Sequence, residues 1–99
     1  EPRQVGRFEL QRHPGGEVEP AVGLGHRAAA RGGTAGCVLN AANEAAVAAF
    51  LAGRIRFTDI AEVCGQVLDR HAFSSEPTLD EIRGLDAWAR EEVATWATA

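Results

Sequence analysis

The chain has 99 residues, four net negative charges and no basic stripe, so it has room for one domain and is a poor candidate for a nucleic-acid binder. It contains no apolar stretch of membrane-spanning length and no secretory signal, and its two cysteines are too few for a disulfide scaffold. We therefore expect a cytoplasmic protein with reduced cysteines. Because the chain begins at Glu1 rather than at methionine, we also expect it to be a piece of a longer protein.

Residues 1–19 are rich in proline and glycine and carry mixed charge. The alternation of Phe8 and Leu10 is compatible with one short strand in an extended arm, and a flexible linker suits the same composition equally well. The sequence at 13–16, His-Pro-Gly-Gly, predicts a turn. We place the helical domain at residues 20–99.

The first helix is expected to begin near Pro20, which suits a first helical turn, and to stop at Gly32 and Gly33. Its apolar stripe consists of Ala21, Leu24 and Ala28. Gly23 and Gly25 each oppose this helix by about 1 kcal/mol relative to alanine.

The second helix is expected to begin at Asn40, a favourable N-cap residue, with Asn43 and Glu44 supplying polar and anionic groups to its first turn. Larger apolar residues then recur at helical spacing among many alanines: Val47, Phe50 and Leu51. Gly53 is expected to end this helix in a left-handed conformation.

Residues 54–57 alternate polar and apolar side chains, as a short extended connector would. Thr58 is expected to cap a third helix whose first turn contains Asp59. Its buried face should consist of Ile60, Val63, Val67 and Leu68. Arg70 and His71 lie at its C-terminal end, where positive charge is favourable.

The last helix carries a local start signal, because Thr78 and Glu81 have the spacing of a capping box. Its apolar stripe continues for 15 residues and consists of Ile82, Leu85, Ala89, Val93 and Trp96, with Trp88 widening it. Gly84 and Asp86 allow a break into a short helix and a longer one.

Three polar residues invite a functional interpretation. Asn40 and Asn43 could bind a polar ligand, and Glu44 could contribute to a divalent-cation site, but one carboxylate is a poor site for a hard cation. Capping of the second helix explains Asn40 and Glu44 without a ligand, so we interpret them as structural.

Histidine and cysteine residues could in principle form a zinc site: His13, His26, His71, Cys37 and Cys64. They lack the short ligand spacings that zinc sites use, and nothing positions a base or an oxyanion hole beside either thiol. Cys64 adjoins the apolar face of the third helix and is interpreted as a small buried hydrophobic residue. The glycines at 23, 25, 32, 33 and 36 lack the spacing and the preceding strand of a dinucleotide-binding loop. The residues alone therefore predict an acidic, mainly α domain without a catalytic centre.

The central part of the chain strongly resembles the C-terminal domain of 1-deoxy-D-xylulose 5-phosphate reductoisomerase. The resemblance rests on four segments, Leu-Asn-Ala-Ala-Asn-Glu at 39–44, Ala-Ala-Phe-Leu at 48–51, Gly-Arg-Ile at 53–55 and Phe-Thr-Asp-Ile at 57–60. Further similarity lies at residues 6–8, 31–35, 67–68, 77–79 and 86–91, so the resemblance covers most of the chain. Gly36, Ala45 and the sequence Gly-Leu-Gly-His at 23–26 depart from the family pattern.

The resemblance implies a small four-helix bundle-like domain that supports a catalytic domain within the same enzyme. That enzyme uses NADPH and a divalent metal, Mg²⁺ or Mn²⁺, in the non-mevalonate isoprenoid pathway. Its cofactor, metal and substrate motifs belong to upstream domains, so the resemblance transfers no catalytic, cofactor-binding or metal-binding residue to this chain. We expect the domain to be inactive alone and to contact the catalytic domain, but neither nucleic acid nor membrane.

Two other hypotheses belong to different functional classes. The chain could be a free-standing interaction or dimerisation module that uses its alanine-rich faces and Trp96. It could also be a small metal- or thiol-dependent enzyme that uses Glu44 or Cys64.

Overall fold

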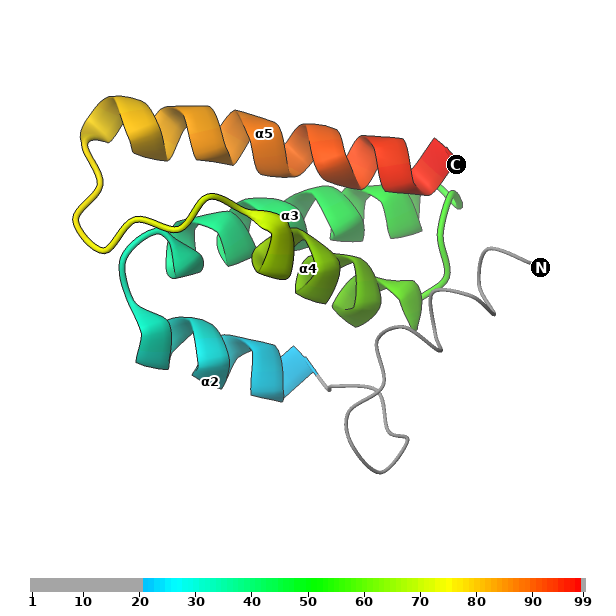
Figure 1. Ribbon diagram of the computed structural model, residues 1–99. Coiled ribbons are helices and arrows are strands. Elements are labelled where there is room, and N and C mark those ends of the chain that lie inside the picture. The colour runs from blue at the N-terminus through cyan, green and yellow to red at the C-terminus, as the bar shows by residue number, and fades with distance from the viewer. Residues whose placement is uncertain (1–20, 99) are drawn as a thin grey trace.

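The computed structural model describes residues 21–98, which form four helices and the segments that connect them (Figure 1). The helices are α2 (Ala21–Arg31), α3 (Ala35–Leu51), α4 (Asp59–Arg70) and α5 (Leu79–Thr98). This confirms the mainly α, four-helix bundle-like fold class. The predicted extended arm at residues 1–19 and the turn at 13–16 lie outside the described residues, and the domain boundary at residue 20 stays a prediction.

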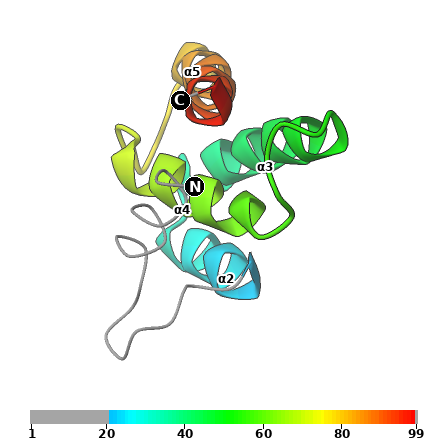
Figure 2. The ribbon, with the colours of Figure 1, turned by 90° about the vertical axis from the view of Figure 1, so that its right-hand side faces the viewer.

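The helix α3 occupies the centre of the molecule and contacts each of the other three helices. α3 and α4 lie side by side, with α5 on one side of the pair and α2 on the other (Figures 1 and 2). Two ion pairs connect the outer helices to α4: Arg27 of α2 binds Asp69 at 2.6 Å, and Arg70 binds Glu92 of α5 at 3.0 Å.

The centre of the core is built from unusually small residues. On α3, the fully buried positions are Ala35, Val38, Ala41, Ala42 and Ala46. Larger side chains come from the neighbouring helices: Leu24, Val63, Val67, Leu68, Val93 and Trp96. Because alanine projects little beyond the backbone, the neighbouring helices can approach α3 closely. The buried face predicted for the third helix is thus confirmed for Val63, Val67 and Leu68, while Ile60 is half-buried.

The first predicted helix is present as α2, despite the glycines within it. Leu24 and Ala28 are buried, and their burial offsets the low helix propensity of Gly23 and Gly25. The predicted stop is also confirmed, because Gly32 and Gly33 have φ angles of 69° and 53°. A β-carbon on Gly33 would lie 2.2 Å from the carbonyl oxygen of Ser74, so this position requires glycine for close packing as well.

The predicted start of the second helix at Asn40 is wrong. α3 begins at Ala35 with Thr34 in the N-cap position, six residues before the predicted N-cap residue. The backbone amide of Thr34 donates to the carbonyl oxygen of Ser74, and the amide of Val38 donates to that of Thr34. Burial of Val38 contributes about 1.5–3 kcal/mol, more than the roughly 1 kcal/mol of an asparagine cap, so the longer helix is favoured. Asn43 and Glu44 consequently lie in the middle of α3 and not in its first turn.

The connection between α3 and α4 follows the sequence prediction more closely. Gly53 has a φ angle of 77°, and the amides of Gly53 and Arg54 donate to the carbonyl oxygens of Phe50 and Ala49. Thr58 occupies the predicted N-cap position of α4, but its side chain makes no capping hydrogen bond. Instead, the buried carboxylate of Asp59 accepts a 2.8 Å hydrogen bond from the amide of Arg56.

The capping box at the start of α5 is confirmed. The amide of Thr78 donates to Glu81 at 2.8 Å, and the amide of Glu81 donates to the Thr78 hydroxyl at 3.1 Å. The break into two helices that Gly84 would allow is absent, because α5 runs continuously from Leu79 to Thr98. The capping box fixes the start of the helix before Gly84, and Leu85, Trp88 and Ala89 after it pack on the core, which outweighs the roughly 1 kcal/mol that glycine costs in a helix.

Candidate functional site

A concave surface lies between α2, α3 and α4, and we call it the α2–α3–α4 groove. Its volume is about 410 Å³. It is lined by Leu24, Gly36, Leu39, Asn40, Asn43, Ile60, Ala61 and Cys64. None of these residues carries a formal charge. The groove is therefore an apolar surface with two amide side chains as its principal polar groups.

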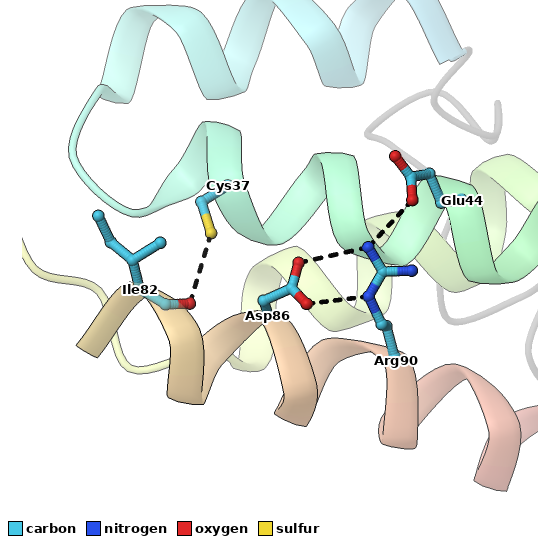
Figure 3. A network of polar contacts seen from close by, with 5 residues as sticks. All are labelled: Cys37, Glu44, Ile82, Asp86 and Arg90. Atoms are coloured by element: carbon cyan, nitrogen blue, oxygen red, sulfur yellow. Dashed lines mark hydrogen bonds and ion pairs between the residues drawn. The ribbon is translucent and has the colours of Figure 1, made fainter. Parts of the chain in front are cut away.

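The structure brings Asn40 and Asn43 together and separates them from Glu44. The two asparagines are exposed, lie one turn apart on α3 and line the groove. Glu44 lies beside α5 instead, where its Oε1 accepts a 3.0 Å hydrogen bond from Arg90 (Figure 3). Because its carboxylate is bound to an arginine, Glu44 is a structural group, although its role is interhelical pairing and not the predicted capping.

Arg90 joins α5 to α3 through two carboxylates. Its Nε donates to Asp86 one turn earlier at 2.9 Å, and its Nη2 donates to Glu44 (Figure 3). The hydrogen bonds that Arg90 donates to Asp86 and Glu44 raise the pKa of its guanidinium. The spacing of Asp86 and Arg90 is a recognisable helical ion pair, whereas the contact with Glu44 has no local sequence signal.

Neither cysteine has the environment of a reactive nucleophile. Burial raises the pKa of Cys64 to about 12, which confirms its interpretation as a small buried residue. The Cys37 thiol donates to the carbonyl oxygen of Ile82 at 3.7 Å (Figure 3). Burial and the nearby negative charge of Asp86 raise its pKa. Both thiols are protonated at neutral pH, and a thiolate is the nucleophilic form.

His71 is buried and belongs to a hydrogen-bonded cluster that we call the clip, formed by Thr34, His71 and Ser74. His71 Nδ1 donates to the carbonyl oxygen of Leu68, and its Nε2 shares a 3.0 Å hydrogen bond with the Thr34 hydroxyl. The Thr34 oxygen in turn accepts from the amide of Ser74 at 3.0 Å. The clip joins the turn before α3 to the segment before α5, and sequence reasoning missed it.

The remaining candidates do not gather into a site. His26 is exposed on α2, and His13 lies outside the described residues. Within residues 21–98, no group of three or more His, Cys, Asp or Glu side chains lies close enough to hold a metal ion. In the same range, no helix is both long and apolar enough to cross a membrane.

The arrangement can bind but offers little for catalysis. The groove offers apolar surface and two amide side chains, whereas Glu44, Cys37 and His71 form hydrogen bonds with other parts of the chain.

Comparison with known proteins identifies relatives. The family described as the DXP reductoisomerase C-terminal domain matches residues 5–92. The 1-deoxy-D-xylulose 5-phosphate reductoisomerase of Rhodopirellula baltica is 56% identical over 71 residues, which are 72% of this chain and 16% of that protein. The enzyme of the same name from Pseudomonas aeruginosa strain UCBPP-PA14 is 46% identical over 94 residues, 95% of this chain and 24% of that protein.

A third relative of the same name, from Synechococcus sp. strain JA-2-3B'a(2-13), is 51% identical over 78 residues, 79% of this chain and 20% of that protein. The chain thus spans between 16% and 24% of the length of these three relatives. No solved structure matches the chain significantly.

Proposed function

The chain belongs to the 1-deoxy-D-xylulose 5-phosphate reductoisomerase family, and on that premise we propose that it is the C-terminal structural domain of such an enzyme. The observation that carries this proposal is a family match over residues 5–92 in a chain that spans less than a quarter of its relatives. In this role the domain supports the catalytic domain and has no activity alone. We place the protein in the cytoplasm, where its two free cysteines would stay reduced.

The enzyme that contains this domain would use NADPH and Mg²⁺ or Mn²⁺. The described residues do not fit the metal, because they contain no suitable group of ligands. Glu44 and His71 are hydrogen-bonded to Arg90 and Thr34 of the same chain. No step of the reaction is therefore assigned to residues 21–98. Their contribution is mechanical, since a packed helical support fixes the position of whatever part of the enzyme contacts it.

Inactivity in isolation has a direct test. The 99-residue chain is incubated with NADPH, Mn²⁺ and 1-deoxy-D-xylulose 5-phosphate, and NADPH consumption is followed by absorbance. We expect no turnover above the rate without protein. Turnover that survives further purification would refute the proposal.

The supporting role is tested in the Pseudomonas aeruginosa enzyme, whose similarity to this chain covers 94 residues. One variant lacks the matching C-terminal segment, and a chimera carries the present chain in its place. We expect the truncated enzyme to lose most of its activity and the chimera to recover a substantial part of it. Full activity after truncation, or a chimera no more active than the truncated enzyme, would show that the support is not needed.

Trp96, which the sequence offered as an interaction residue, is buried in the core, so that part of the hypothesis is wrong. A second candidate function, a free-standing dimerisation or interaction module, would instead use two exposed apolar side chains. Leu51 and Phe57 are 76% and 72% exposed. Sedimentation of the 99-residue chain separates the two functions: a stable dimer at micromolar concentration supports the module, and a monomer supports the domain of a larger enzyme.

A further inference from the structure

We draw no further inference here: the strongest candidate, the alanine-lined trough between α3 and α5 that Arg54 and Arg90 border, is a stripe of small residues in which the charge of Arg90 is already bound by Asp86 and Glu44, and nothing within residues 21–98 shows what covers it.

Discussion

The helices α3 and α5 pack against each other, yet they differ sharply in the residues they expose. The 20 residues of α5 include seven charged ones, Asp80, Glu81, Arg83, Asp86, Arg90, Glu91 and Glu92, whereas the 17 residues of α3 include one. The sequence of α5 has the charges of a helix that faces water on its outer side. That of α3 has mostly alanines inside and, apart from Glu44, uncharged residues outside. The two helices therefore differ in charge as well as in the size of the side chains they bury.

The largest effect should come from Gly33, which directly precedes Thr34 of the clip and packs against Ser74. The clip fixes the start of α3 against the segment that leads into α5. Gly33→Ala would place a β-carbon against the Ser74 carbonyl and also force alanine into a left-handed conformation. We expect a loss of about 3 kcal/mol or more in the free energy of unfolding, measured with urea. Gly32→Ala is the control, because Gly32 shares the positive φ but has no described atom within 4 Å of the added carbon. It should cost only about 1 kcal/mol. Equal losses would mean that the clip is loosely packed.

A second prediction compares the inner and outer sides of α3. Ala46 is fully buried and Ala48 is exposed. Ala46→Leu should destabilise the domain by about 2 kcal/mol, because three extra carbon atoms must be accommodated in a filled core. Ala48→Leu should change stability by less than about 0.5 kcal/mol. Similar losses from both substitutions in urea unfolding would contradict the assignment of an exposed side to α3.

Local signals in the sequence were sufficient for most of the helices. The Thr78–Glu81 capping box, the stop at Gly32 and the left-handed Gly53 involve residues close together in the chain, so spacing alone predicts them. The start of α3 depends instead on the hydrogen bond between Thr34 and Ser74, 40 residues apart. The pairing of Glu44 with Arg90 spans 46 residues. Such contacts exist only after folding, and a preference for capping by Asn40 could not anticipate them.

The candidate site shows the same division. Cys64 was predicted to be buried because it adjoins the apolar face of its helix, and this was correct. The Asn-x-x-Asn-Glu sequence was treated as one group, but helical geometry directs Glu44 toward α5 and both asparagines toward the groove. The exposure of Leu51 and Phe57 could not be predicted, because helical spacing shows which apolar residues share a face but not what packs against that face.

The third prediction concerns alkaline pH and the wall of the groove. The chain contains no lysine and no tyrosine, so cysteine is the only side chain expected to titrate between pH 9 and 12. Above pH 9 the Cys64 thiol ionises in the unfolded chain, while in the native state its pKa is about 12. The native state then binds more protons, so this contribution to stability is complete below pH 9 and is lost as the pH rises toward 12.

The expected loss through Cys64 approaches about 1.4 kcal/mol per pH unit in that range. Urea unfolding at pH 8, 9 and 10 measures it, and Cys64→Ala should remove most of the slope. Cys37→Ser is the control and should preserve the part that belongs to Cys64. A slope unaffected by Cys64→Ala would show that this wall of the groove is accessible to water.

The smallest effect is expected at the ion pair between Glu44 of α3 and Arg90 of α5. Glu44→Gln removes one of the two carboxylates bound to Arg90 but leaves Asp86, and the groups are partly exposed, so the melting temperature should change by about 2 °C or less. Asp86→Asn should have a distinct second effect, because the negative charge of Asp86 raises the pKa of Cys37. Its removal lowers that pKa, increases the thiolate fraction at pH 8 and should accelerate thiol labelling of Cys37 in a Cys64→Ala background. Glu44→Gln should leave the labelling rate unchanged. If the two variants label equally fast, Asp86 does not control the thiol, and the charged side of α5 has less influence on α3 than the ion pairs indicate.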